Sequence, residues 1–247
     1  INLRFNMSKS SQWLLLTGLG VLIISPDSLL IRLVNISDFS LIFYRSYLQA
    51  VPLFLFCLFI YRRDTLSAFL AIGIPGIVYA LLFATTHIAF VYSIQHTAVS
   101  NTLVIIAGAP IFSAILSIIF LNEKPSFFTW LIIFIALASM FIIGWGSYTT
   151  LGIFGDFMAI ICAIAMGSGV VLARYFKKID LVPACFVGCI IAGLFTLPFE
   201  IDFNLNFNQI IYLSLMCFIL LPIPFIIMTI APKVYSCLPS ISCFLLR

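Results

Sequence analysis

Charge is what this sequence has least of. Only 8% of its 247 residues are Asp, Glu, Lys or Arg, whereas 64% are hydrophobic. So little polar sequence cannot cover a water-soluble domain of this length, which excludes an ordinary soluble globular protein. The chain has only two His, and it contains no nucleophile–base pair, glycine-rich phosphate loop or zinc-protease motif. We therefore expect no catalytic residues, and an integral-membrane enzyme is a disfavoured alternative.

Basic residues outnumber acidic ones, 12 to eight, but they are dispersed among short connections, which is not the pattern of a nucleic-acid-binding protein. Five of the seven Cys lie inside apolar runs, where Cys behaves as a small hydrophobic residue. No His or acidic residue joins them at the spacing of metal ligands, so we expect no metal and no cofactor. These cysteines are Cys57, Cys162, Cys185, Cys189 and Cys217.

Long apolar runs make up most of the chain. A helix needs about 20 apolar residues to cross a bilayer, because hydrocarbon solvates neither charges nor free backbone groups. Eight such runs predict an all-α, polytopic membrane protein, and proline interrupts four of them, at Pro26, Pro75, Pro110 and Pro222. The predicted spans are 12–34, 40–61, 67–94, 98–121, 127–147, 152–175, 182–199 and 208–231.

Basic residues fall in alternate connections between these spans. The other connections contain no Lys or Arg, and Arg32, near the end of the first span, is the one local exception. Short loops rich in Lys and Arg mark the cytoplasmic side, so the N-terminus is predicted to be cytoplasmic in an inner or plasma membrane. The basic connections contain Arg4, Lys9, Arg62, Arg63, Lys124, Arg174, Lys177, Lys178 and Lys233.

The chain also shows weak internal similarity, because the offset that places Arg32 on Arg174 also places Asp38 on Asp180. The first unit has five spans, so a copy that begins at the sixth span enters the membrane from the opposite side. This is the inverted-topology repeat of many secondary transporters. The predicted divisions are a cytoplasmic segment, a first repeat, an incomplete second repeat of three spans and an aberrant or truncated tail, at 1–10, 11–147, 152–233 and 234–247.

Several stretches resemble EamA-type members of the drug/metabolite transporter superfamily. The most specific is an Ala-Pro…Leu-x-Glu-x-Pro-Ser pattern, which runs from AGAPIF at 107–112 to LNEKPS at 121–126. Supporting similarity lies at 20–33, in the Phe-Tyr-Arg of 43–45 and in the Gly-Asp of 155–156. The resemblance implies two inverted five-helix repeats, with both termini cytoplasmic, in a carrier of small solutes.

By this resemblance the chain is a carrier that moves an amino-acid-, cofactor- or drug-like metabolite by alternating access. No apolar span follows residue 233, so we expect the chain to hold eight of ten spans. A native eight-span protein and a nonfunctional or structural remnant of a transporter are open alternatives. The expected partners are the lipid bilayer and a small-molecule solute, without nucleic acid, and a homodimer is one open arrangement.

Five polar residues inside the spans are candidates for substrate binding: Asp27, Arg45, Gln49, His87 and Asn101. An ionisable group at the bilayer centre costs several kcal/mol, so it is a functional hypothesis by default. A rise of about 1.5 Å per residue puts four of them in the outer half of the membrane, and Gln49 lies one turn deeper than Arg45 on the same face. Arg45 would bind an anionic group of the substrate and Asp27 a cationic one.

Each candidate also has a structural interpretation. Arg45 and Arg32 could extend their side chains to the outer interface, or Asp27 could form an ion pair with Arg45. His87 could be a neutral, hydrogen-bonded helix contact, and Asn101 a helix cap. For Asp156 we favour a structural role, because a carboxylate at the start of a helix suits the positive end of the dipole. The small-residue runs at 107–109 and 167–169 predict close helix packing.

Overall fold

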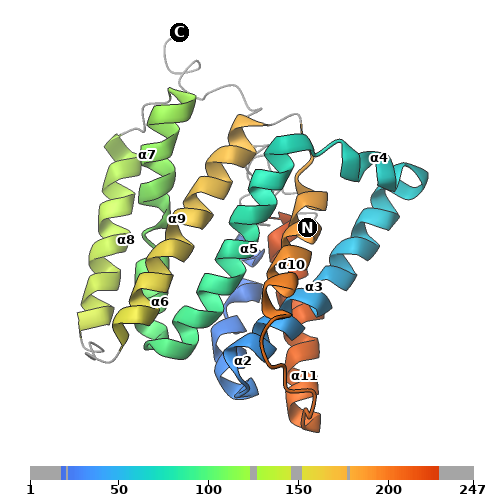
Figure 1. The fold of residues 1–247 in the computed structure, drawn as a ribbon. Helices are drawn as coiled ribbons and strands as arrows, with labels where there is room; N and C mark the ends of the chain where they lie inside the picture. Colours follow the sequence, from blue (N-terminus) through green and yellow to red (C-terminus); the bar gives the residue numbers. More distant parts are fainter. Residues whose placement is uncertain (1–17, 21, 123–126, 146–151, 177–178, 228–247) are drawn as a thin grey trace, which may run out of the picture.

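The computed structural model of the chain describes residues 18–20, 22–122, 127–145, 152–176 and 179–227. Every element in these ranges is a helix, as the apolar runs predict (Figure 1). The elements are α2 (Asp27–Val34), α3 (Asp38–Tyr61), η1 (Arg62–Asp64), α4 (Thr65–Leu70), α5 (Gly73–His96), α6 (Val99–Ile106), α7 (Ala109–Leu121), α8 (Phe127–Trp145), α9 (Ile153–Tyr175), α10 (Val182–Thr196), α11 (Phe207–Leu215) and η3, a π-helix (Met216–Leu220).

Each of the eight predicted spans contains a described helix. Within the part of the chain that the structure describes, five helical segments are long and apolar enough to cross a membrane, and α10 is a shorter apolar helix. The all-helical class is therefore confirmed, whereas the inverted repeat and the ten-span architecture stay predictions. The predicted terminal segments 1–10 and 234–247 lie outside the described residues. The five long segments are Asp38–Leu70, Gly73–His96, Val99–Leu121, Ile153–Tyr175 and Phe207–Ile227.

The third predicted span, 67–94, is wrong as a single helix. Its first residues belong to the short helix α4, and α5 begins only at Gly73, whose φ of 54° is the left-handed conformation that glycine adopts without strain. Pro75 was expected to break the span, but it lies in the first turn of α5, where the missing N–H of proline costs nothing. The interruption therefore falls a few residues before the proline.

The fourth span is interrupted as expected. Helix α6 ends at Ile106, and α7 begins at Ala109 with Pro110 in its first turn. In the eighth span, a π-turn over Met216–Leu220 follows α11, and Pro222 comes just after it. π-Turns inside helices occur frequently at functional sites, and this one packs against the candidate site described below.

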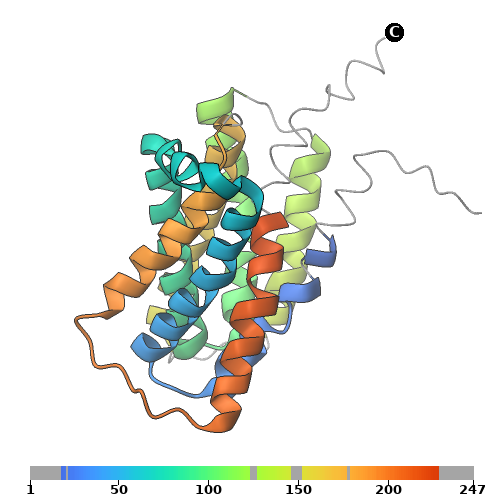
Figure 2. The same ribbon diagram turned by 90° about the vertical axis from the view of Figure 1, so that its right-hand side faces the viewer.

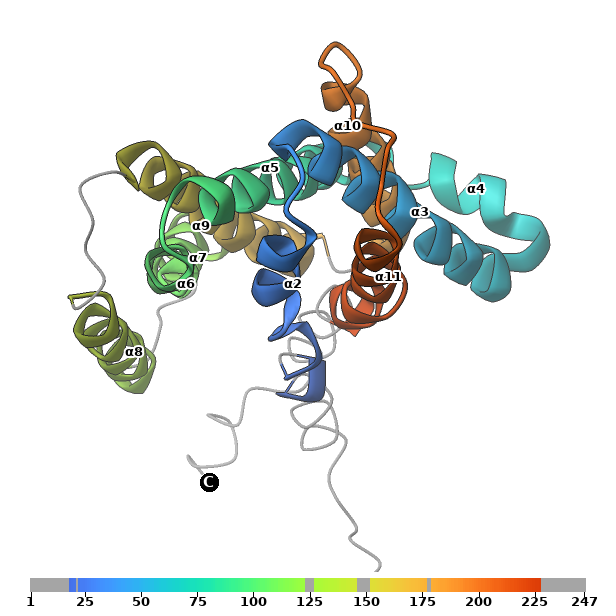
Figure 3. The same cartoon turned by 90° about the horizontal axis from the view of Figure 1, so that it is seen from below.

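Helix α5 lies at the centre of the bundle. It packs along α9, α10 and α3, and α7 packs against α9 in turn. Viewed from below, α8 lies at one edge of the molecule and α4 at the opposite edge (Figure 3). The view in Figure 2 shows α11 beside α3, with which the π-turn is also in contact. Helices α2, α3, α5 and α11 therefore enclose one shared region.

Small residues set the closest helix contacts. A Cβ on Gly167 of α9 would lie 2.8 Å from the carbonyl oxygen of Ala109, so the two small-residue runs noted in the sequence do meet. A Cβ on Gly188 of α10 would lie 2.8 Å from the carbonyl oxygen of Ala80 on α5. In lipid, helices associate through such close packing rather than through the hydrophobic effect, so these glycines position α9 and α10.

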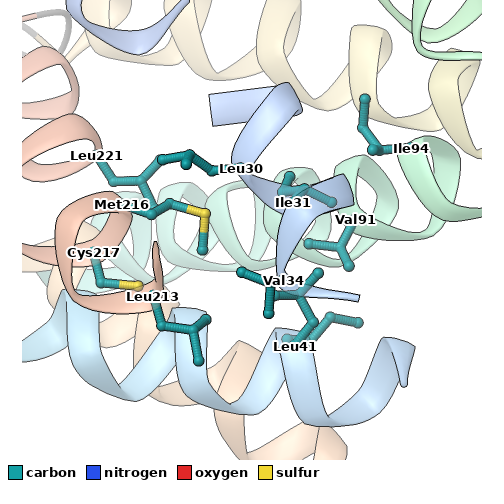
Figure 4. Packing of buried hydrophobic residues seen from close by; sticks show 11 residues of the cluster. Leu30, Ile31, Val34, Leu41, Val91, Ile94, Leu213, Met216, Cys217 and Leu221 are labelled. Carbon is teal, nitrogen blue, oxygen red and sulfur yellow. The ribbon is translucent and has the colours of Figure 1, made fainter. Parts of the chain in front are cut away.

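The largest buried apolar cluster joins α2 to α3, α5 and the α11 segment (Figure 4). The outer surface is apolar as well: Phe59, Ile74 and Phe127 are each 78% exposed. An apolar surface of this kind suits contact with lipid chains. The cluster consists of Leu30, Ile31, Val34, Leu41, Ile42, Val91, Ile94, Leu213, Met216, Cys217 and Leu221.

Apart from Asp27 and Arg45, the charged residues that the structure describes lie at the two ends of the bundle. We call these the Asp38 end, where α3 and α11 begin and α5 ends, and the Arg63 end, where α3 ends and α10 begins. At the Arg63 end, the hydroxyl of Tyr61 donates to Asp180 and so joins α3 to the start of α10.

Candidate functional site

A buried ion pair lies between α2 and α3. Nη2 of Arg45 donates to Oδ2 of Asp27 over 2.8 Å, and each residue is only 2% exposed. Asp27 is the first residue of α2, directly after the turn at Pro26, and Arg45 lies two turns inside α3. The break in the first span thus brings a carboxylate to the depth of the guanidinium.

Several buried polar atoms of this pair and of the next turn of α3 have no hydrogen-bond partner among the described residues. They include Oδ1 of Asp27, Nε and Nη1 of Arg45, the hydroxyl of Ser46 and both amide atoms of Gln49. Gln49 follows Arg45 by one helical turn, so the two side chains share a face of α3. Buried polar groups are almost always hydrogen-bonded, and an unpaired one is costly. This cluster can therefore bind a polar ligand through several donors and acceptors.

Aromatic rings line the α5 side of the pair. Cζ of Arg45 lies 5.2 Å from the centre of the Phe90 ring, a cation–π distance. His87, one turn before Phe90, lies 4.7 Å from the ring of Phe83 and 5.5 Å from that of Phe225. Both ring nitrogens of His87 are buried and have no partner in the described part of the chain. The imidazole can therefore still donate one hydrogen bond and accept another.

The segment after α11 closes the site from the other side. Sγ of Cys217, in the π-turn, donates to the carbonyl oxygen of Arg45 over 3.8 Å. Cys217 also belongs to the apolar cluster that holds α2 against α3 and α11 (Figure 4). Packing on three helices thus fixes the backbone on both sides of the ion pair.

Asn101 lies apart from these residues in the contacts that the structure describes. It is in the first turn of α6, 5% exposed, and its side-chain atoms have no partner among the described residues. The next residue, Thr102, bonds Ser93 of α5 across 2.7 Å. The structure thus brings Asp27 and Arg45 into contact. Gln49 lies one helical turn from Arg45, and His87 lies one turn from Phe90. No contact that the structure describes joins Asn101 to any of them.

Two of the structural interpretations are wrong. Arg45 does not extend to the interface, because Asp27 binds it in the interior. Asn101 does not cap α6, since Ala98 occupies the cap position and the Asn101 amide has no partner among the described residues. His87 contacts aromatic rings, and its role as a hydrogen-bonded helix contact stays a prediction. The expected pairing of Asp27 with Arg45 is present, and Arg32 is exposed at the Asp38 end as expected.

Polar contacts bind the helices together at the Asp38 end. Nη2 of Arg32 donates to the carbonyl oxygen of Thr97 over 2.6 Å, and the Thr97 hydroxyl donates to Oδ1 of Asp156 over 2.8 Å. Nε2 of His96 and Oδ2 of Asp38 lie 2.7 Å apart. Asp156 therefore has the structural role expected of it. Thr97 and His96 were not predicted from the sequence, where no motif marks them.

The connection before α11 is tied to the same end. The Tyr44 hydroxyl donates to the carbonyl oxygen of Asp202 over 3.0 Å, and the backbone N–H of Asp202 donates to Oγ of Ser40 over 2.8 Å. The Gln209 amide donates to the carbonyl oxygen of Val34 over 2.9 Å. These contacts join parts of the chain far apart in sequence and hold the ends of α2, α3 and α11 together at the Asp38 end.

Long apolar helices packed around a buried, incompletely bonded ion pair define an integral membrane protein of the helical class. The family model of the EamA-like transporter family matches residues 8–145, more than half of the chain. The chain therefore belongs to the EamA-like transporter family, whose members are membrane transporters of small solutes. No curated protein and no solved structure is significantly similar to it.

Proposed function

We propose that this protein is a carrier that moves a small polar organic solute across the membrane, and that the solute binds at the Asp27–Arg45 pair. The single observation that carries the proposal is that Asp27, Arg45 and Gln49 are buried and keep polar atoms without a hydrogen-bond partner among the described residues. Charges inside a span are costly and mark the pathways of substrates and ions in membrane proteins. Membership of a transporter family gives these costly groups a function.

The position of the pair suits a binding site that opens to each side in turn. A rise of about 1.5 Å per residue puts Arg45 about 10 Å from the start of α3, and Phe90 about 9 Å from the end of α5. Both depths are inside the span of these helices, and both charged residues are 2% exposed. In the described conformation the pair itself is shielded from both sides, as in the occluded state of an alternating-access carrier.

The packing pattern supports two inverted repeats. If the first three spans are exchanged with the sixth to eighth, the contact of α5 with α9 corresponds to that of α11 with α2. The contact of α3 with α10 joins the second span to the seventh, so the exchange leaves it unchanged. Repeats of opposite topology let a carrier rock about a fixed site near the repeat interface. We propose this motion here, in a plasma or inner membrane with the Arg63 end cytoplasmic.

The test is counterflow into proteoliposomes that contain the full-length protein. Amino acids, polyamines, nucleosides and nucleotide-like cofactors are first screened by thermal shift, and the labelled form of each hit is then offered to vesicles loaded with the unlabelled form. We expect saturable uptake of at least one compound. Gln49→Leu should slow this uptake about tenfold, because losing one buried hydrogen bond to the solute costs about 1.4 kcal/mol.

Gln95→Leu is the matched control. This glutamine is also on a membrane-spanning helix, but its amide donates to the carbonyl oxygen of Ile36 near the Asp38 end. The same chemical change there should leave the uptake rate within about twofold, because it removes one ordinary hydrogen bond outside the site. Equal rates for the two variants would contradict a solute site at Gln49, and failure of every compound would contradict transport itself.

A further inference from the structure

We propose that two polar contacts at the Asp38 end form a gate of the solute site, and that both must break before the site opens on that side. They join Arg32 to the carbonyl oxygen of Thr97, and Asp38 to His96. We call these two contacts the Asp38 gate. This inference rests on the proposed function, because it names the contacts that close the proposed site.

The packing divides the helices around the site into two groups. Helices α5, α6, α7 and α10 are joined through α5 and α9 and form the α9 group, whereas α2 and α3 pack on α11 and its π-turn and form the α11 group. Viewed from below, α6 and α7 lie to one side of α2, and α11 lies to the other (Figure 3). The repeat exchange proposed above maps one group onto the other. The contact of α3 with α10 joins them, so it is the pivot about which the groups can rock.

The Asp38 gate joins the α11 group to the end of α5, which belongs to the α9 group. Nη2 of Arg32, on α2, donates over 2.6 Å to the carbonyl oxygen of Thr97, the residue that caps the end of α5. Oδ2 of Asp38, the first residue of α3, lies 2.7 Å from Nε2 of His96, the last residue of α5. The end of a helix has a partial negative charge, which suits the guanidinium of Arg32.

Thr97 takes part in contacts of both kinds, between the groups and within one of them. Its carbonyl oxygen accepts from Arg32 of the α11 group, whereas its hydroxyl donates to Asp156 of α9, in its own group. The amide of Gln95 also reaches the α11 group, at the carbonyl oxygen of Ile36, but over 3.3 Å. This longer, neutral bond is weaker, so we leave it out of the gate.

The Asp38 gate lies on the same helices as the buried ion pair. Asp38 precedes Arg45 by seven residues, or two turns, so the two residues share a face of α3. Leu41 lies between them in sequence and packs in one apolar cluster with Val34 of α2 and Ile94 of α5, all 0% exposed (Figure 4). Separating the two groups at this end would part this apolar layer and give water a path to the pair.

The gate contacts can break at little cost because they are near water. The side chains of Asp38 and His96 are 23% and 44% exposed, and Arg32 is exposed as well. Exposed ion pairs are exchanged for contacts with water with little net loss of free energy, whereas breaking a buried pair is expensive. We therefore assign the repeated opening to these contacts and not to the Asp27–Arg45 pair.

The Arg63 end has a contact of the same kind. The hydroxyl of Tyr61, at the end of α3, donates to Asp180, just before α10, so this contact also joins the two groups. The repeat offset places Asp38 on Asp180, so each repeat supplies one acidic residue to a gate at a different end. An alternating-access carrier needs a gate on each side, and we assign the Tyr61–Asp180 contact to the second one.

The first test measures opening of the site with one reporter cysteine. Gln49→Cys is placed in a cysteine-free background, because Gln49 is 0% exposed and lies one turn from Arg45. An impermeant maleimide is added to intact cells or to inverted membrane vesicles. Arg32→Met and His96→Phe together remove both gate contacts and should speed labelling at least about fivefold from one side, as expected for the loss of two weak bonds. Tyr61→Phe should speed it from the other side.

Thr97→Val is the matched control. It removes the hydroxyl that bonds Asp156 within the α9 group and keeps the carbonyl oxygen that Arg32 contacts. Labelling of Gln49→Cys should stay within about twofold in this variant, because no bond between the groups is lost.

The second test locks the gate and serves also if the Arg32 and His96 variants fail to fold. A short bifunctional methanethiosulfonate joins Asp38→Cys to His96→Cys between the groups, or Thr97→Cys to Asp156→Cys within one group. The native side chains of both pairs are in contact, over 2.7 and 2.8 Å. Cross-linking the first pair should stop counterflow until the link is reduced, and cross-linking the second should leave it unchanged.

The outcomes separate the gate from the proposed function. Unchanged labelling of the Arg32→Met/His96→Phe variant from both sides would overturn the gate, and so would an equal increase in Thr97→Val. Equal loss of counterflow in the two cross-linked pairs would also overturn it. Labelling needs no solute, so it tests the gate alone, whereas failure of every compound in counterflow would contradict the proposed function.

Discussion

Removing one partner of the Asp27–Arg45 pair should destabilise the protein far more than removing both. Asp27→Leu leaves a guanidinium buried without its counter-ion, and breaking a buried pair in this way costs about 3–5 kcal/mol. Arg45→Met leaves a carboxyl group, which can be neutralised by taking up a proton, whereas a guanidinium stays charged. Arg45→Met also loses the contact with Phe90, about 0.5–2 kcal/mol. We therefore expect both single variants to be strongly destabilised, and Asp27→Leu more so.

The double variant Asp27→Leu/Arg45→Met replaces the pair with apolar side chains. Such replacements are often neutral or stabilising by about 1–4 kcal/mol, because no charge has to be desolvated. The assay is thermal unfolding of the purified protein in detergent. If 1 kcal/mol corresponds to about 2–4 °C for a chain of this size, the single variants should melt on the order of 10 °C lower and the double variant near the wild type. Small and additive shifts would refute the buried, mutually dependent pair.

Three further predictions concern the packing, the Asp38 end and the orientation. Gly188→Ala should lower the stability measured by thermal unfolding by about 1–3 kcal/mol, because the new Cβ would lie 2.8 Å from a carbonyl oxygen of α5. The control Gly169→Ala, where the nearest atom is 3.7 Å away, should be tolerated. Equal losses of stability in the two variants would contradict this packing. Thr97→Val should lower stability by about 1 kcal/mol, because the hydrogen bond from Thr97 to Asp156 of α9 is lost. Thr97→Ser keeps the hydroxyl and should melt near the wild type. Identical melting temperatures of the two variants would exclude that bond. In a cysteine-free background, an impermeant maleimide added to intact cells should label Asn204→Cys and not Arg63→Cys, and the reverse result would invert the proposed topology.

The helices were predictable from the sequence because a membrane imposes one simple requirement, a long apolar run for each crossing. The start of α3 and the end of α9 agree with the predicted spans to within two residues. The pairing of Asp27 with Arg45 followed from the same rule, since counting residues from the ends of two neighbouring spans gave similar depths. Depth along a helix is nearly independent of tertiary packing, so it can be counted from sequence.

What could not be predicted depends on how the helices meet. Thr97 bonds Arg32 and Asp156 because the ends of three segments converge on it, and none of these residues is near the others in sequence. The contact of Gly188 with Ala80 depends on how α10 is rotated about its own axis. A polar face would indicate that rotation, but the sequence of α10 is almost wholly apolar. The start of α5 at Gly73 is not evident from the sequence, because the nearby Pro75 is the stronger signal of an interruption.

The central claim, that a solute binds at the buried polar cluster, is tested most directly by protection of position 49 from alkylation. Gln49 lies one turn from Arg45 on the same face of α3, and both of its amide atoms are buried and unpaired among the described residues. In a cysteine-free background, a solute identified by counterflow should slow the reaction of Gln49→Cys with N-ethylmaleimide at least tenfold at saturation. The control Ser168→Cys, which replaces a hydroxyl bonded within α9, should react at the same rate with and without the solute. A transported solute that leaves the Gln49→Cys rate unchanged would contradict the claim.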